Sequence, residues 1–143
     1  MIKAKEFWDV ICNTFDYRFF SGIPCSDFDK LYKTMSSNFM HYIPAANEMV
    51  GLNLVNGVRL AGLNSALLID LSSIDKLDFN FNLDSNIPLL ILGSGQLSSS
   101  YRFKDSFSLL KLTSNITKSL EKAVSAIDNG HSCIIRIGKG DIS

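Results

Sequence analysis

Two side chains that could do chemistry follow short apolar segments. Glu48 ends the run Ala45-Ala46-Asn47-Glu48, and Cys25 follows Gly22-Ile23-Pro24. A carboxyl group can act as a general acid or base, and a thiol can act as a nucleophile when a neighbouring base activates it. Each position also has a simpler interpretation. Glu48 can be a structural carboxylate at a helix start capped by Asn47, and Cys25 can be an ordinary thiol.

Cations and imidazoles that could support such chemistry are scattered along the chain. Arginine suits bidentate recognition of an anionic ligand, and Arg102, which follows a serine-rich segment, is the best-placed candidate. The other candidates are Arg18, Arg59 and Arg136, and for each of the four a solvated surface charge is the alternative. His41 could relay protons or be a structural histidine.

The cysteines do not form a metal-binding pattern. Cys12, Cys25 and Cys133 are far apart, and the chain has two histidines. This spacing argues against a structural zinc site. We expect Cys12 and Cys133 to be buried thiols.

Strands and helices are expected to alternate along the chain. Four-residue spacing of apolar residues predicts helices over 4–15, 28–35, 47–61 and 116–127, the last ended by Asn129-Gly130. Short apolar runs predict strands at 17–20, 39–43, 66–71, 87–92 and 133–137. Residues 72–86 are expected to be a loop or short helix, residues 93–100 a mobile loop, and residues 101–114 receive no assignment.

The helix over 47–61 has two features that the structure can test. Val50, Leu54 and Val58 form one apolar stripe, which predicts the buried face. Gly51 and Gly57 weaken the helix propensity, and each is expected to permit the close approach of a neighbouring element.

This alternation predicts one domain over residues 1–143. It favours an α/β three-layer sandwich with a mainly parallel central sheet and right-handed crossovers. The length of 143 residues and the hydrophobic content of 46% fit one domain with a substantial core.

Charge and hydropathy exclude several classes of partner. The 14 basic and 14 acidic residues give zero formal net charge, which argues against a nucleic-acid footprint. The longest apolar runs are strand-length, well below the roughly 20 residues that span a bilayer, and no apolar signal core follows the N-terminal lysines. We therefore expect a cytoplasmic protein with no membrane association.

Several segments together resemble a known enzyme family. Residues 19–26, Phe-Phe-Ser-Gly-Ile-Pro-Cys-Ser, are similar to the pattern Phe-Phe-x-Gly-Val-Pro-Asp-Ser, and residues 43–48, Ile-Pro-Ala-Ala-Asn-Glu, to Ile-x-Ala-Ala-Asn-Glu. Residues 57–62 and 133–140 resemble a helix end and a domain-closing strand with its Lys-Gly turn. These are patterns of the N-terminal domain of thiamine-diphosphate-dependent phosphonopyruvate decarboxylases and of the alpha subunit of sulfopyruvate decarboxylases.

The resemblance implies a fold and a function. The fold is the pyrimidine-binding (PYR-type) domain of the thiamine-diphosphate-binding fold. Glu48 is expected to hydrogen-bond the pyrimidine N1′ of thiamine diphosphate and to supply its proton. The expected cofactor-binding residues are Glu48, Asn47, Pro24, Cys25, Ser26 and, with less support, Ser72. The substrate would be a small anionic 2-oxo acid that resembles phosphonopyruvate or sulfopyruvate and loses carbon dioxide.

The resemblance also implies a partner. The family binds diphosphate through Mg²⁺ with a Gly-Asp-Gly motif followed by Asn, and this chain has no Gly-Asp-Gly. The Mg²⁺ ligands are therefore expected from a separate diphosphate-binding (PP-type) subunit, the alternative being that this chain is one piece of a longer polypeptide. Active sites in this arrangement lie between chains, so a homo- or hetero-oligomer is expected.

The sequence also departs from the family pattern. The Asp of Gly-x-Pro-Asp-Ser is Cys25 here, and the Gln-Asn-Ser-Gly-Leu-Gly-Asn segment corresponds to residues 70–76, in which only Ser72 matches. The alternative hypothesis is accordingly a catalytically degenerate PYR-like domain with a partner-binding or regulatory role.

Overall fold

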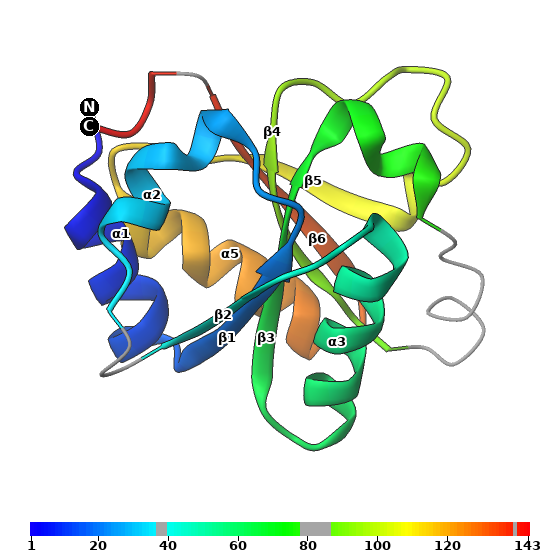
Figure 1. The fold of residues 1–143 in the computed structure, drawn as a ribbon, viewed down its shortest axis with the longest axis horizontal. Helices are drawn as coiled ribbons and strands as arrows, with labels where there is room; N and C mark the ends of the chain where they lie inside the picture. The colour runs from blue at the N-terminus through cyan, green and yellow to red at the C-terminus, as the bar shows by residue number, and fades with distance from the viewer. Residues whose placement is uncertain (37–39, 78–86, 139) are drawn as a thin grey trace.

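One parallel sheet forms the centre of the molecule (Figure 1). The computed structural model describes residues 1–36, 40–77, 87–138 and 140–143. Within these residues the strands are arranged in the order β2-β1-β3-β4-β6-β5, and every neighbouring pair is parallel. The strands are β1 (Tyr17–Gly22), β2 (His41–Pro44), β3 (Asn64–Asp70), β4 (Leu90–Ser94), β5 (Phe107–Lys111) and β6 (Ser132–Ile137).

Helices cover both faces of this sheet. On one face lie α1 (Ala4–Asp9), its π-helical continuation η1 (Val10–Thr14), α2 (Asp29–Lys33) and α5 (Ile116–Asp128). On the other face lie α3 (Glu48–Leu60) and the 3₁₀ helix η3 (Leu71–Lys76). Two further 3₁₀ helices, η2 (Ser26–Phe28) and η4 (Lys104–Ser106), precede α2 and β5. The predicted α/β three-layer sandwich is confirmed.

Two apolar cores follow from this layering. Alternate residues of β4 divide between them, because Leu90 and Leu92 face the α1–α2–α5 layer while Ile91 faces the α3 layer. The first core is centred on Trp8, whose ring packs edge-on against Phe20 at 5.0 Å and whose Nε1–H donates to the Leu31 carbonyl at 2.8 Å. Burial on both faces explains why the central strands are nearly continuous apolar runs.

The buried face of α3 differs from the prediction. Leu52 and Val55 enter the core, whereas Val50 is 41% exposed and Leu54 and Val58 are only partly buried. The helix carries two apolar stripes, and sequence spacing does not distinguish them. The predicted stripe of Val50, Leu54 and Val58 was therefore wrong.

The close approach predicted for the two α3 glycines holds for one of them. A Cβ built on Gly51 would lie 3.3 Å from the Gly22 Cα and 3.3 Å from the Leu67 side chain. A Cβ at Gly57 would meet no atom within 4 Å, so the prediction for that residue was wrong. The Gly51 contact sets the rotation of α3 against the end of β1.

Sequence patterns also missed an edge strand. β5 pairs only with β6 and has the burial pattern of one buried residue, Phe107, followed by largely exposed ones. Gly93 and Ser94, expected in a loop, continue β4 instead, and the predicted start of that strand at Ile87 was three residues early. Residues 71–76 form the expected short helix, whereas Phe39 and residues 78–86 of the predictions lie outside the described residues.

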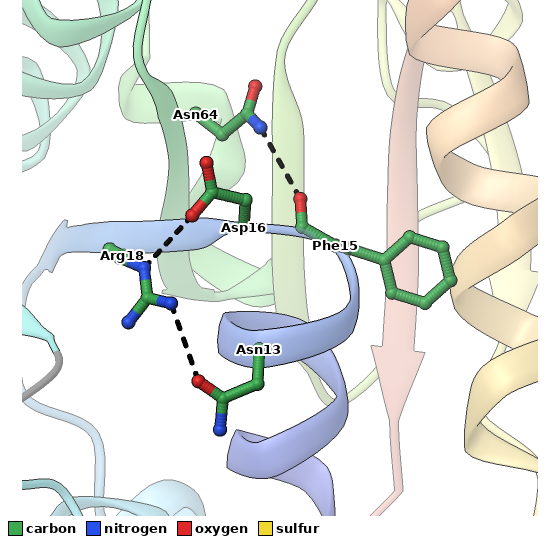
Figure 2. Close-up of polar contacts among 5 residues, drawn as sticks. All are labelled: Asn13, Phe15, Asp16, Arg18 and Asn64. Carbon is green, nitrogen blue, oxygen red and sulfur yellow. Dashed lines mark hydrogen bonds and ion pairs between the residues drawn. The ribbon is translucent and has the colours of Figure 1, made fainter.

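Polar contacts hold the turn before β1 (Figure 2). Asp16 has a positive φ of 60°, and its carboxylate accepts from Arg18 Nε at 2.9 Å. Arg18 Nη2 also donates to Asn13 Oδ1 at 3.4 Å, and Asn64 Nδ2 donates to the Phe15 carbonyl at 3.4 Å. These contacts place Arg18 at the amino edge of the sheet, where it stabilises the turn.

The two glycines at positions 22 and 57 give opposite predictions for alanine substitution. Gly22 has φ +149°, and an added Cβ would overlap the carbonyl oxygen of Leu68. We expect Gly22→Ala to lower the free energy of unfolding by about 2–5 kcal/mol through strain and overpacking. Gly57→Ala, in open helical surface, should raise it by about 0.5–1 kcal/mol. Urea denaturation measures both, and equal effects of the two changes would contradict this account of Gly22.

Candidate functional site

The carboxyl edge of the sheet brings the predicted site segments together. Because every strand is parallel, the ends of β1, β2, β3 and β4 lie at the same edge, with Gly22 paired to Pro44 and Asp70 paired to Ser94. The chain adds β2 on one side of β1 and then β3 on the other. Such a switch in direction leaves a crevice outside the strand ends, where open α/β sheets bind ligands.

Glu48 is the first residue of α3 at this edge. The Asn47 side chain caps the helix by accepting the Val50 N–H at 3.0 Å, and the Ala45 N–H donates to the Gly22 carbonyl at 2.9 Å. These bonds tie the helix start to the end of β1. The positive end of the helix dipole favours a carboxylate at this position.

The Glu48 side chain is sheltered, with 16% of its surface exposed. Lys76 Nζ, at the end of η3, lies 3.7 Å from Glu48 Oε1, and the Lys76 side chain is 64% exposed. This exposure makes the ion pair weak, since water screens it. Glu48 can therefore accept a hydrogen bond from a bound molecule without leaving a strong internal partner.

Cys25 lies in the loop after β1. Its N–H donates to Tyr32 Oη at 3.1 Å, and its Sγ is 3.5 Å from Ser94 Oγ at the end of β4. A neutral hydroxyl cannot take a proton from the thiol, so the described contacts supply no activating base. The interpretation of Cys25 as an ordinary thiol fits these contacts better than a nucleophile does.

The other two cysteines are core residues, as predicted. Cys12 and Cys133 are fully buried in the first core. Burial raises the pKa of the Cys12 thiol to about 11 and that of the Cys133 thiol to about 12. Both therefore stay protonated and unreactive at neutral pH.

The remaining predicted site residues reach the same edge in different settings. Pro24 and Ser26 are exposed in the loop between β1 and α2. Ser72 donates from Oγ and from its N–H to Asp70 Oδ1, both at 2.9 Å, which caps η3. The edge thus gathers all six residues, but no hydrogen bond or ion pair joins any two of them in the described structure.

Two residues at this edge were missed by the sequence prediction. Ser94 ends the apolar strand β4, and the rule that ligands gather at strand ends could have identified it. Lys76 approaches Glu48 from another helix across 28 positions of sequence, and no local pattern indicates such a contact.

The arginine and histidine candidates are divided between the two edges. Arg59 Nη1 donates to Asn64 Oδ1 at 2.9 Å at the amino edge, on the same side as Arg18. His41 begins β2 there and is exposed. Arg136 Nε donates to the Gly95 carbonyl at 2.8 Å, and the Arg102 guanidinium lies 4.5 Å over the Phe103 ring. Only these last two lie toward the carboxyl ends of the strands.

Comparison with known family models and curated proteins identifies no relative of this chain. No known family model matches the chain, and no curated protein matches it. In the described residues no group of three or more His, Cys, Asp or Glu side chains could hold a metal ion. No helix found in the same ranges is long and apolar enough to cross a membrane.

The three thiols should differ in reactivity. At pH 8 we expect an aromatic disulfide reagent to modify Cys25 in the folded chain, while Cys12 and Cys133 react only after unfolding, because their side chains have no solvent contact. Mass spectrometry after limited reaction identifies the modified residue. A Cys25→Ser chain that reacts as fast as the parent would contradict this assignment.

Burial of Cys12 predicts a loss of stability at alkaline pH. The folded thiol has a pKa of about 11, against 9.0 for an unperturbed cysteine, so the stabilisation is complete below pH 9 and falls as pH rises from 9 to 11. The loss should reach about 2–3 kcal/mol for this one thiol. Urea denaturation from pH 8 to 11 measures it. The Cys12→Ala chain should lose less stability over this range, and parallel curves for the two chains would rule out the effect.

Proposed function

We propose that this chain is the pyrimidine-binding subunit of a thiamine-diphosphate-dependent 2-oxo acid decarboxylase. Its substrate is a phosphonopyruvate- or sulfopyruvate-like anion, and a separate diphosphate-binding subunit completes the active site. The observation that carries the proposal is the position of Glu48, a sheltered carboxylate at the start of α3 beside the end of β1.

The convergence of the two motif segments supports this proposal. Residues 19–26 and 43–48 are separate in sequence, yet β1 and β2 pair side by side and end together at Gly22 and Pro44. The Ala45 N–H to Gly22 carbonyl bond then joins the two loops. A shared ligand would contact both loops at this point, as the family resemblance implies.

The residues at this edge fit the pyrimidine half of the cofactor. A sheltered carboxylate is the acceptor that a protonated ring nitrogen requires, and the hydroxyl and thiol of Ser94 and Cys25 lie at the same edge as further polar contacts. Two glycines, Gly22 and Gly51, face each other where the end of β1 meets the first turn of α3. When bound, thiamine diphosphate supplies the electron-accepting thiazolium that loss of carbon dioxide from a 2-oxo acid requires.

In the proposed reaction, the residues of this chain position the pyrimidine ring and protonate its N1′ atom. The Glu48 carboxyl group would donate its proton to the pyrimidine N1′, and the resulting carboxylate would accept a hydrogen bond from the protonated ring. Its limited contact with water would strengthen that hydrogen bond. Lys76 is exposed enough to turn into solvent when the ring takes its place beside Glu48. The Mg²⁺ ligands come from the partner subunit, in a cytoplasmic oligomer.

A second candidate function rests on the contacts around Glu48 and Cys25. Lys76 already pairs with Glu48, and Cys25 contacts a hydroxyl where the family has an acidic residue. A domain with these contacts could bind the partner subunit and regulate it without turning over substrate. In that case the complex would assemble but release no carbon dioxide.

Substitution of Glu48 tests the proposal. In the complex purified from the native host, with thiamine diphosphate and Mg²⁺ added, we expect carbon dioxide release from phosphonopyruvate or sulfopyruvate. Glu48→Gln should reduce kcat about 10²–10⁴-fold, because the amide cannot supply the proton. Release of carbon dioxide is followed with a coupled assay.

Glu121→Gln is the matched control, because Glu121 is an exposed carboxylate on α5, on the opposite face of the sheet. It should leave turnover unchanged. Undiminished activity of the Glu48→Gln complex would remove Glu48 from the mechanism. An inactive but intact parent complex would favour the regulatory alternative.

A further inference from the structure

A cleft of about 1010 Å³ opens between η3 and residues 96–103. Its apolar walls come from two segments that are distant in sequence, and they consist of Leu71, Ile74, Leu77, Leu97, Tyr101 and Phe103. Its volume is at the upper end of the range for small-molecule sites, which are mostly apolar with a few converging polar groups. The cleft has the size and lining of a ligand site.

Tyr101 lines this cleft and has a buried hydroxyl with no hydrogen-bond partner among the described residues. The residue is 8% exposed, and its hydroxyl is buried and forms no hydrogen bond with any part of the chain that the structure describes. Its ring packs edge-on against Phe103, with centroids 6.0 Å apart. Buried hydroxyls are nearly always satisfied, so an unpaired one in a cleft wall points to a ligand that supplies the missing partner.

The partner of Tyr101 should be a hydrogen-bond acceptor. Burial raises the pKa of the Tyr101 phenol, with a further contribution from the Asp75 carboxylate, and Arg102 opposes these effects. The phenol therefore stays protonated and has a hydrogen to donate to a ligand. A ligand oxygen at this position would receive its hydrogen.

Charge in the cleft favours an anion. The described lining contains two cations, Lys76 and Arg102, and one carboxylate, Asp75, and Lys76 also lies 3.7 Å from Glu48 Oε1 outside the lining. Arg102 stacks over the Phe103 ring at 4.5 Å, so a cation and an aromatic wall lie together. A ligand with one negative charge and a flat apolar body complements this combination.

We propose that this cleft is a binding site for a small aromatic carboxylate. The ring packs between the apolar walls from η3 and residues 97–103. The carboxylate accepts the Tyr101 hydroxyl hydrogen and faces Lys76 and Arg102. This site does not require the proposed decarboxylase function, because its contacts include neither Glu48 nor thiamine diphosphate, although it shares Lys76 with the Glu48 ion pair.

Titration of the full chain with sodium benzoate, followed by ¹H–¹⁵N NMR, tests the site. We expect saturable shifts confined to residues 71–77 and 96–103, with a Kd of about 1 mM or tighter for a ligand of this size. Benzyl alcohol, with the same ring and no charge, should bind at least about 10-fold more weakly. Shifts that do not saturate, that centre elsewhere, or that are equal for the two compounds would overturn the proposal.

The Tyr101 hydroxyl is tested separately. Tyr101→Phe removes a group that has no partner in the free chain, so the fold should be retained and benzoate affinity should fall about 5- to 10-fold. Tyr42→Phe is the matched control, because Tyr42 carries a buried hydroxyl on β2 and packs against the opposite core. It should bind benzoate as the parent does. Equal affinities of the parent and Tyr101→Phe chains would also overturn the proposal.

Discussion

The close contact between Gly22 and Gly51 determines where α3 lies. Neither residue has a Cβ, and a Cβ built on Gly51 in the first turn of the helix would lie 3.3 Å from the Gly22 Cα that ends β1. A larger residue at position 51 would push the helix start away from the sheet and carry Glu48 with it, whereas at position 22 an added Cβ would overlap the Leu68 carbonyl oxygen of β3. The candidate site therefore depends on a backbone contact as much as on its polar side chains.

The two edges of the sheet have different polar character. At the amino edge, Asn13, Asp16, Arg18 and Asn64 are bonded to one another or to nearby backbone, and they serve the turn into β1. At the carboxyl edge, Glu48 has a weak ion pair with Lys76, and the Tyr101 hydroxyl in the adjoining cleft has no hydrogen-bond partner within residues 1–36, 40–77, 87–138 and 140–143. Glu48 thus lies where parallel sheets commonly bind ligands, and water screens its charged partner Lys76.

Sequence patterns predicted the elements that are buried on both sides. β3, β4 and β6 stand out because alternate residues enter two cores, which makes their sequences apolar throughout. β5 was missed because an edge strand buries little beyond Phe107. The buried face of α3 was assigned wrongly because its rotation depends on the Gly22–Gly51 contact, which is invisible in helical spacing.

For the candidate site, the sequence predicted which residues belong to it but not their contacts. The family resemblance predicted Glu48, Cys25 and Ser72 as members of one site, and in the structure they lie at one edge because parallel strands end together. Their individual contacts were not predictable, because the Ser94 and Lys76 partners come from elements brought together only by the tertiary fold.

Lys76 lies between the Glu48 site and the cleft that Tyr101 lines. Its ammonium lies 3.7 Å from Glu48, and its side chain also lines the cleft beside Tyr101. A carboxylate held in the cleft would therefore compete with Glu48 for a single cation. A molecule that hydrogen-bonds to Glu48 would release Lys76 and so raise the affinity of the cleft for an anion. Thermodynamic linkage makes the effect reciprocal, so an anion in the cleft would raise the affinity of the Glu48 site for that molecule by the same factor.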